Sequence, residues 1–596
     1  MNSRGAVGHR GSGAGGIRAQ IFGFLAGAAA AIVAVSMPLC AEAYAGTTAI
    51  AGNHSEEAAG LAGEGVVAPE RALRMEIVLA LRNRAELDRL AADQVDSSSP
   101  RYHRWLSSAE FNARFGPTQS DVAALTRWLE QSGFTIQSAS ASRRSIVFTG
   151  SAEKAQKAFS VRIAASADGK TYANLDDPAV PEKLAPLIGT IRGLSNMMRA
   201  VPVVSASLAR RPPSLPAVTE GGVTAFGPQD LWTFYDYNSL QAGGIDGTGT
   251  DCIGLVENSN WDSSGVTAFD TTFALPAANV TQTFADGSDP GIIDGADTEA
   301  ELDVEYSHAA APGAPIVAYI GSDAASKGNG LPDAIARAIH DNTCGAVSIS
   351  FAFCGADPAF FTKQLDPLFA EAAAHGQGVY VSAGDWGAAG LGVDRHMNCV
   401  VTKARKISEM AGDPNVTAVG GTSFNPTYNS SGLDVGNVAE TVWHDGNKEP
   451  AGTTGGGRSS LFKKPAFQTA STPKDKARDI PDISLGASPN NPGYFFGDSG
   501  SILCCIGGTS LSAPYWAGIA QLVAQQAGEA RAGNLNAKIY ALGALGNAAS
   551  SGLRDVTTGN NSFNGVAGYA AGIGYDRASG WGTPDIGVFV PAAAGK

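Results

Sequence analysis

A serine at the start of a long apolar run is the first feature of this sequence that could do chemistry. Gly507 to Pro514 read Gly-Gly-Thr-Ser-Leu-Ser-Ala-Pro, and the apolar run follows from Tyr515 to Val523. A small-residue loop that delivers Ser510 to the start of a buried helix leaves its hydroxyl beside unpaired backbone N–H groups and the positive end of the helix. We therefore predict an acyl-transfer nucleophile. The alternative is an ordinary N-capping serine on a core helix.

A serine hydroxyl is a weak nucleophile and needs a base. None of the eight histidines lies in surroundings typical of a catalytic histidine, and His308 is the best of them. Glu299 and Asp303 are better placed, because their four-residue spacing puts both on one face of a helix. Close carboxylates share a proton, so Glu299 could accept the Ser510 proton while Asp303 orients it. The alternative is a solvated acidic helix face, since this stretch carries further acids.

A third carboxylate follows an apolar run that is typical of a buried strand. Asp385 lies in the segment Ser382 to Gly387, Ser-Ala-Gly-Asp-Trp-Gly. At the carboxyl end of a strand its protonated side chain could donate a hydrogen bond to a developing oxyanion. An ionised carboxylate there would repel the oxyanion, so such an enzyme must work in acid. The alternative is a plain Gly-Asp turn.

These residues lie in a segment of short apolar strands alternating with helices, which begins at about Phe226. The strands are apolar on both faces, as parallel strands covered by helices are. Expected strands span residues 253–256, 316–320, 346–350 and 378–382, and expected helices span 331–342 and 362–374. The pattern predicts a doubly wound, mostly parallel sheet that binds ligands beyond the carboxyl ends of its strands.

A separate α/β domain is expected over residues 65–200, to within a few residues. Helical spacing from Leu73 to Leu90 and from Asp121 to Gln131 alternates with strand-like runs at 146–148 and 161–163. A linker follows from Ser205 to Val218, rich in Pro, Ser and Ala and containing Arg210-Arg211. Its composition predicts an exposed, extended segment suited to proteolytic nicking.

The N-terminus has the pattern of a secretory signal peptide. Basic residues precede the apolar run from Ile21 to Met37, and small residues offer cleavage near Ala43 or Ala45. An uncleaved membrane anchor is the alternative, since the run is just long enough. We expect an exported protein with no stable membrane association after cleavage.

Six cysteines remain once Cys40 is removed with the signal peptide, an even number that suggests disulfides in an exported chain. The adjacent Cys504 and Cys505 are not expected to pair with each other, because that geometry is strained. The spacing of the six fits no zinc site.

Charge divides the chain into two complementary parts. Residues 1–215 contain 23 Lys and Arg against 18 Asp and Glu, whereas the rest contains 19 against 38. A basic N-terminal part lying on an acidic C-terminal part is typical of an intramolecular chaperone or inhibitor. No basic patch is interleaved with aromatic residues, so nucleic acid is not an expected partner.

Both domains resemble the sedolisin (kumamolisin-like) family of serine-carboxyl peptidases. The segments that carry the resemblance are 101–106, 110–111, 115–117, 172–175 and 193–196 in the first domain, and 419–422, 455–459, 478–484 and those around the acids and Ser510 in the second. It implies an α/β fold with a subtilisin-like doubly wound sheet, preceded by a smaller α+β ferredoxin-like propeptide. It also implies that nucleophile, base, orienting acid and oxyanion donor correspond to Ser510, Glu299, Asp303 and Asp385.

The resemblance has two departures. Gly507 stands where many members have Ser, a change between small residues. Some members extend the carboxylate network through a further Glu, which Glu257 matches, and a Trp, which Phe351 replaces. Because Phe cannot donate a hydrogen bond, we expect a shorter outer network here.

A calcium site is expected near the C-terminus. Asp555 and Asp576 flank a loop rich in Gly and Asn, and carboxylates with main-chain carbonyls are the ligands that Ca²⁺ prefers. In related enzymes the ligands of one ion correspond to the side chains of Asp555 and Asp576 and the carbonyls of Val556, Gly572 and Gly574. A plain turn-rich loop is the alternative.

Together these features predict a secreted, acid-acting endopeptidase that cleaves polypeptides and is made as a self-processing monomeric precursor. The expected parts are a signal peptide (1–45), a propeptide domain (46–204) that also binds the enzyme, a processing linker (205–225) and a peptidase domain (226–596). Two alternatives stay open, a tripeptidyl-peptidase of the same family and a catalytically silent secreted binding protein.

Overall fold

The computed structural model describes residues 46–206, 225–293, 295–321 and 330–596. The expected signal peptide, Arg210-Arg211 and nearly all of the expected linker lie outside the described residues. Within the described part of the chain, no helix is long and apolar enough to cross a membrane.

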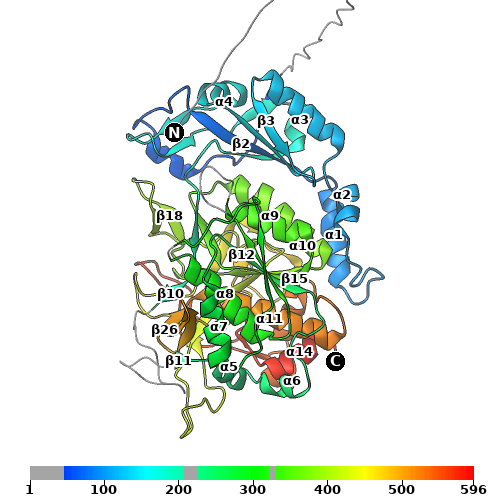
Figure 1. Ribbon diagram of the computed structural model, residues 1–596, viewed down its shortest axis with the longest axis vertical. Coiled ribbons are helices and arrows are strands. Elements are labelled where there is room, and N and C mark those ends of the chain that lie inside the picture. The colour runs from blue at the N-terminus through cyan, green and yellow to red at the C-terminus, as the bar shows by residue number, and fades with distance from the viewer. Residues whose placement is uncertain (1–45, 207–224, 294, 322–329) are drawn as a thin grey trace, which may run out of the picture. The chain divides into compact units, whose positions relative to one another are not determined.

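The N-terminal domain contains a four-stranded antiparallel sheet, and two of its helices, α3 and α4, lie beside that sheet (Figure 1). Its strand order is β3-β4-β2-β8, and the helix α4 (Ala152–Phe159) precedes the last of these strands along the chain. That order is the ferredoxin-like α+β topology that the resemblance implies. Its strands are β2 (Ala72–Leu79), β3 (Thr135–Ala139), β4 (Ser145–Ser151) and β8 (Ile188–Arg192), and its other helices are α1 (Arg84–Val95), α2 (Ser108–Arg114) and α3 (Gln119–Gln131).

One prediction for this domain is wrong. Helical spacing was predicted from Leu73 to Leu90, but β2 occupies the first half of that range, and only Arg84 onward is helical. The strand pairs with β4 along one edge and with β8 along the other, so it lies inside the sheet. Nearly all of its apolar side chains are buried. Tertiary pairing therefore outweighs the local spacing.

The C-terminal domain is built on a sheet of seven parallel strands with one antiparallel strand at its edge. The order is β13-β14-β12-β15-β17-β20, after which β20 pairs with β24 in parallel and with β21 in antiparallel fashion. The strands are β12 (Cys252–Glu257), β13 (Val280–Phe284), β14 (Ile316–Ile320), β15 (Cys344–Ile349), β17 (Gly378–Ser382), β20 (Thr417–Ser423), β21 (Thr441–Val442) and β24 (Ile483–Gly486). The predicted doubly wound sheet and its four predicted strands are confirmed.

Helices cover both faces of this sheet. One core contains buried side chains of α8 (Asp297–Ala310), α11 (Thr509–Ala527) and α14 (Ile586–Ala594), and the other contains those of α9 (Leu331–Asp341) and α10 (Asp366–His375). Buried apolar residues on both faces explain why the strands read as continuous apolar runs. The sheet therefore presents only its strand ends to solvent or substrate.

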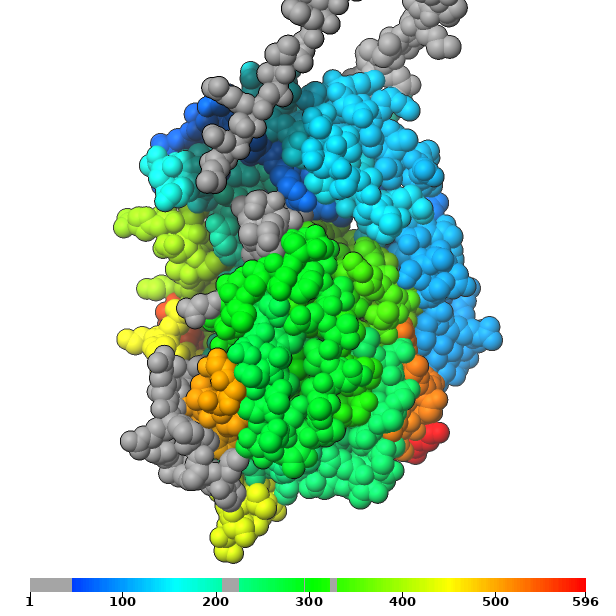
Figure 2. Space-filling view, viewed as in Figure 1, coloured from blue at the N-terminus to red at the C-terminus, as the bar shows by residue number. Residues whose placement is uncertain are grey.

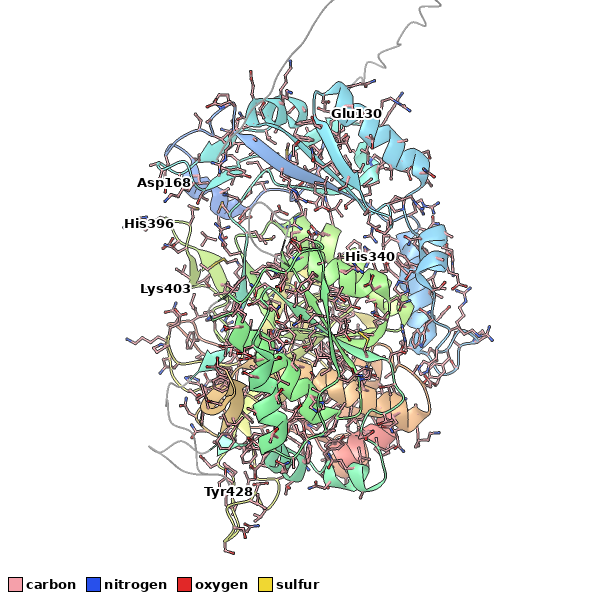
Figure 3. All side chains as sticks on the ribbon, viewed as in Figure 1. Glu130, Asp168, His340, His396, Lys403 and Tyr428 are labelled. Carbon is pink, nitrogen blue, oxygen red and sulfur yellow. A yellow bond between two sulfur atoms is a disulfide. The ribbon has the colours of Figure 1, made fainter. Side chains whose placement is uncertain are left out.

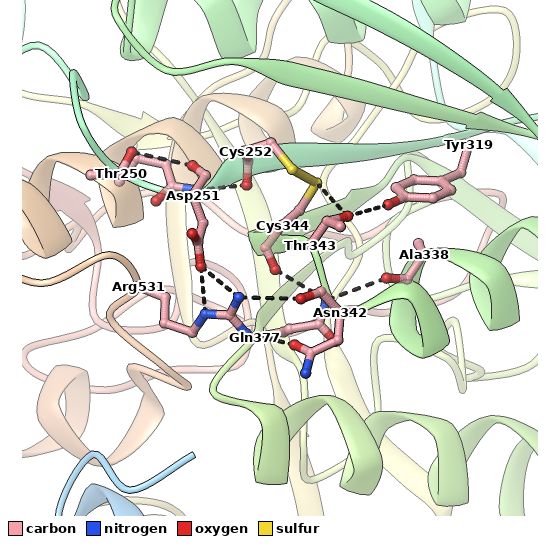
Figure 4. The surroundings of a disulfide bond; sticks show 11 residues. Thr250, Asp251, Cys252, Tyr319, Ala338, Asn342, Thr343, Cys344, Gln377 and Arg531 are labelled. Carbon is pink, nitrogen blue, oxygen red and sulfur yellow. Dashed lines mark hydrogen bonds and ion pairs between the residues drawn. A yellow bond between two sulfur atoms is a disulfide. The ribbon is translucent and has the colours of Figure 1, made fainter. Parts of the chain in front are cut away.

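Three disulfides lie in this domain, as export predicts. Cys252 pairs with Cys344 at the starts of β12 and β15, beside an ion pair between Arg531 and Asp251 (Figure 4). The second bond joins Cys354 to Cys399. The third joins Cys504 to Cys505, so the prediction that these adjacent cysteines would not pair is wrong. A cis peptide bond links them, and their Cα atoms are 2.9 Å apart.

Buried polar contacts join the two domains. Arg144 of the N-terminal domain pairs with Glu371 on α10, at 2.9 Å, and the side chains of both are at most 5% exposed. His340, labelled in Figure 3, also contacts Glu371, at 3.0 Å. Leu106 donates its N–H to the carbonyl of Ala374 and accepts a bond from His375. The predicted complementary charges thus meet at Arg144–Glu371 and also at Arg84–Asp366.

Candidate active site

The predicted site residues meet at the carboxyl end of the parallel sheet. β12 ends at Glu257, Ser350 directly follows β15, and Asp385 comes three residues after β17. Thr509 and Ser510 open α11 at the same edge. This is the edge at which open α/β sheets bind ligands.

Ser510 is buried at the first turn of α11. Its hydroxyl donates to the carbonyl oxygen of Ser350 at 3.3 Å. Gly508, which precedes the helix, has φ +114°, and a Cβ there would lie 2.7 Å from Asp385 Oδ2. Only glycine fits this close approach.

Glu299 and Asp303 lie on α8, and both side chains are fully buried. The alternative of a solvated acidic face is therefore wrong. The neighbouring hydroxyls of Ser510 and Ser350 act against the rise in the pKa of Glu299, but neither carboxyl oxygen of Glu299 has a hydrogen-bond partner. The Ser510 hydroxyl, now turned to Ser350, thus lies beside Glu299 but is not joined to it.

Burial is the main cause of the pKa shifts in this cluster. It raises the pKa of Glu299 well above its usual range, and the charges of Asp303 and Asp385 raise it further. The pKa of Asp303 rises to about 8 for the same reason, although a bond from Ser350 acts against the rise. The carboxyl groups cannot all ionise together, so they retain protons at a pH where free carboxyls have lost them.

Ser350 connects both parts of this cluster. Its hydroxyl donates to Asp303 Oδ1 at 2.8 Å, while its carbonyl accepts the Ser510 hydroxyl. Its role was not predicted from the sequence. A polar residue directly after a buried strand, beside the departure at Phe351, was the available signal.

Asp385 is held at the start of α11 by hydrogen bonds to both carboxyl oxygens. Thr509 donates to Oδ1 from its N–H at 2.9 Å and its hydroxyl at 3.0 Å. The Ser205 hydroxyl lies 2.8 Å from Oδ2. Burial raises the pKa of Asp385 to about 7, despite these bonds. The neutral acid that the oxyanion role needs is thus present throughout the acid range.

The outer network is short, as predicted. Glu257 is fully buried, and burial followed by the charges of Asp303 and Glu299 raises its pKa well above the usual range. Phe351 packs in the apolar core of the sheet and offers no donor. Phe351 therefore does not extend the carboxyl cluster beyond Glu257.

His308 does not take part in the site. Its ring is buried on α8, where Nε2 lies 2.8 Å from the Pro276 carbonyl oxygen and 3.5 Å from Asp270. These contacts tie α8 to α7 (Ser263–Thr272) and to the loop after it. A structural role explains this histidine.

A segment of the chain itself runs through the site. β9 (Arg199–Pro202) pairs in antiparallel fashion with β16 (Phe351–Cys354), and β10 (Ser205–Ala206) pairs likewise with β26 (Ser501–Gly507). Figure 2 shows part of β26, in orange, at the surface beside green residues of the helical face. The end of the N-terminal domain therefore lies on both sides of Ser510.

The predicted calcium ligands share one loop. Gly574 donates its N–H to Asp555 Oδ2 at 2.7 Å, and Gly572 donates to Asp576 Oδ2 at 2.9 Å. Burial raises the pKa of both acids, and within the described residues neither forms an ion pair. An exposed carboxylate, Asp555, and a half-buried one, Asp576, lie beside the carbonyls of one Gly-rich loop without a cationic partner, a set of ligands that fits a hard cation.

The fold and this site define a subtilisin-like α/β peptidase that follows an N-terminal activation domain. Residues 59–197 match the protein family described as "Pro-kumamolisin, activation domain". The chain is 32% identical to sedolisin of Pseudomonas sp. (strain 101), covering 86% of this chain and 85% of that protein. It is 28% identical to kumamolisin of Bacillus sp. (strain MN-32), covering 90% and 94%. It is 25% identical to tripeptidyl-peptidase 1 of Rattus norvegicus, covering 88% and 92%.

A solved structure agrees with these similarities. Pseudomonas sedolisin, complexed with two molecules of pseudo-iodotyrostatin, matches 62% of this chain and 98% of its own at 28% identity, with a TM-score of 0.52. The chain belongs to the sedolisin family of serine-carboxyl peptidases.

Proposed function

We propose that this protein is a secreted, acid-acting endopeptidase made as a self-processing precursor. Ser510 attacks the scissile carbonyl, Glu299 accepts its proton and later returns it to the leaving amine, and Asp303 orients Glu299. Neutral Asp385 donates a hydrogen bond to the oxyanion. The observation that carries the proposal is the hydroxyl of Ser510 buried among carboxyls whose pKa values are raised.

The internal segment favours cutting within chains over removal of tripeptides. Residues 199–206 lie along both sides of Ser510, so chain extends in both directions from the nucleophile. A tripeptidyl-peptidase must close its cleft three residues before the cut. Here all four residues of β9 (Arg199–Pro202) pair with β16 on the N-terminal side of the nucleophile, so this side of the cleft holds more than three residues.

Calcium at the C-terminal loop would serve stability. The side chains of Asp555 and Asp576 with the carbonyls of Val556, Gly572 and Gly574 would hold one ion. When bound, the ion supplies a positive charge beside these two carboxylates.

The test compares two serines of the same helix turn. Ser510→Ala should abolish both self-processing and cleavage of an added unstructured polypeptide in acid. Ser512→Ala is the matched control, because Ser512 is equally buried but donates its bond to Leu485, and it should keep both activities. Cleavage by Ser510→Ala would overturn the nucleophile, and steady release of tripeptides by the wild-type protein would overturn the endopeptidase assignment. A wild-type protein that cuts nothing in acid would favour the silent binding protein.

A further inference from the structure

The segment that runs through the site has the form of an uncut substrate. β9 aligns Val201 with Ala352 and Pro202 with Phe351, and after only two more residues β10 aligns Ser205 with Gly507. Val203 and Val204 are therefore the residues that cross the nucleophile. An extended chain paired by its backbone on both sides is how proteins bind a peptide by strand addition.

The contacts of Val203 identify the reacting carbonyl. Its N–H donates to the Ser350 carbonyl at 3.0 Å, the same oxygen that accepts the Ser510 hydroxyl at 3.3 Å. A Cβ on Gly508 would lie 2.7 Å from the Val203 carbonyl oxygen and 2.7 Å from Asp385 Oδ2. The Val203 carbonyl thus lies beside both the proposed oxyanion donor and the start of α11.

The residues beyond this carbonyl are held in place. Ser205 contacts Asp385 Oδ2 through its hydroxyl, and its backbone nitrogen would lie 3.1 Å from a Cβ on Gly508. Successive residues of an extended chain point to opposite sides. The next peptide carbonyl, that of Val204, therefore faces away from Asp385.

We propose that the Val203–Val204 peptide bond is the first bond that the enzyme cuts, a proposal that rests on the proposed function. Ser510 Oγ attacks the Val203 carbonyl carbon while its proton passes to Glu299. The carbon–nitrogen bond breaks, and Glu299 returns the proton to the Val204 nitrogen, which leaves as an amine. Water then hydrolyses the Val203 ester and restores the Ser510 hydroxyl.

The same contacts name a substrate class. Val203 is fully buried in a cluster with Ala352, Cys354 and Leu391, against which Trp386 packs. A pocket of this kind takes an aliphatic residue of valine size, and a long charged side chain would be desolvated without a partner. The mature enzyme should therefore cut after small branched aliphatic residues in an extended chain.

The experiment follows the masses of both fragments after the wild-type precursor is moved into acid. At the earliest times we expect one fragment ending at Val203 and one beginning at Val204. Val203→Arg should slow this cut at least tenfold, whereas Arg210→Gln with Arg211→Gln should leave it unchanged. A first cut at any other bond overturns the assignment. So does a first cut that is lost when Arg210 and Arg211 are changed to Gln.

A synthetic peptide of residues 199–206 separates this proposal from the proposed function. Mature enzyme should cut it between its two adjacent valines, and the Val203→Arg peptide should be cut at least tenfold more slowly. An enzyme that digests unstructured polypeptides but cuts this peptide elsewhere refutes the bond assignment alone. A precursor that cuts neither itself nor any peptide at any pH refutes both.

Discussion

The hydroxyl of Ser350 lies 2.8 Å from Asp303 Oδ1 and donates a hydrogen bond to it. Because this bond acts against the rise in the pKa of Asp303, Ser350→Ala should raise that pKa further. The acid limb of the pH–rate profile should move to higher pH, and kcat should fall by about tenfold to a hundredfold, as expected for a lost bond to a charged group.

Ser348→Ala is the matched control for this change. Its hydroxyl is equally buried on β15 but has no hydrogen-bond partner, so its loss should leave the profile in place. Ser350→Thr keeps a hydroxyl and should restore most of the rate. If Ser350→Ala lowers the rate at every pH without shifting the pH–rate profile, Ser350 has a merely structural role.

Asp385 sets the expected loss of activity toward neutral pH. Its pKa of about 7 means that the neutral, donating form is present in acid and disappears as the pH rises through that value. Asp385→Asn donates at every pH, so its rate should no longer fall there, whereas Asp385→Ala should lose about a hundredfold to a thousandfold of kcat. Rates between pH 3 and 9 test this. If Asp385→Asn keeps the wild-type fall, another group controls it.

The buried acids should make the precursor less stable as the pH rises. Burial raises the pKa of Glu299 in the folded state, so its protonated form contributes stability below the unfolded value of about 4.3. That contribution is lost as the pH climbs toward the folded value. In a Ser510→Ala background, Glu299→Gln should therefore raise the melting temperature more at pH 8 than at pH 4.

An exposed glutamate is the control for this measurement. Glu130 lies at the surface of α3 (Figure 3), and Glu130→Gln should give no such difference between the two pH values. Equal gains for Glu299→Gln at pH 4 and pH 8 would contradict the assigned direction of the pKa shift.

The pair of Arg144 and Glu371 should hold the two domains together in acid. The charges of His340 and Arg144 hold the pKa of Glu371 below its usual range against the opposing effect of burial. Its carboxylate contributes stability above the unfolded pKa, and that contribution is lost only as the pH falls through the lower folded value. Acid alone therefore leaves this contact in place, and the chain must be cut before the two domains separate.

Arg144→Ala should weaken this contact by less than the ~3–5 kcal/mol expected when a buried charge loses its one partner, because His340 still contacts Glu371. Hydrogen exchange of the α10 amides in the Ser510→Ala precursor should rise accordingly. Arg143→Ala is the control, since Arg143 bonds to the Pro117 carbonyl within its own domain. Equal protection in both variants would contradict the role of the pair.

Calcium removal should destabilise the C-terminal loop. We expect a chelator to lower the melting temperature of the Ser510→Ala precursor, and added Ca²⁺ to restore it. Asp576→Asn should remove most of this dependence, because it deletes one of the two carboxylates. If a chelator leaves the melting temperature unchanged, the proposed calcium site is wrong.

Local patterns were sufficient to predict the sheet, because its strands are buried on both faces. Residues 316–320 and 378–382 were predicted as strands with the bounds that the structure has. β2 was missed because its apolar spacing also fits a helix, and only pairing with β4 and β8 decides between the two.

The site residues were predictable where their chemistry requires an uncommon residue type or spacing. Spacing on α8 predicted that Glu299 and Asp303 lie together, and a Gly-flanked turn after an apolar strand predicted Asp385. Ser350, Thr509 and Ser205 were missed, since serine and threonine are common in turns and their roles depend on contacts between distant segments. The Cys504–Cys505 bond was not expected, because the prediction relied on the usual geometry of disulfides.

When the N-terminal segment departs, β16 and β26 are left with unpaired backbone edges facing each other across Ser510. Only a chain that can straighten over about eight residues could replace it, because it must satisfy both edges at once. A compact, well-packed globular protein exposes no such stretch. We thus expect the mature enzyme to degrade unfolded proteins and to leave native ones intact. Acid would then have two effects that favour cleavage: it would denature the substrate proteins and keep Asp385 neutral.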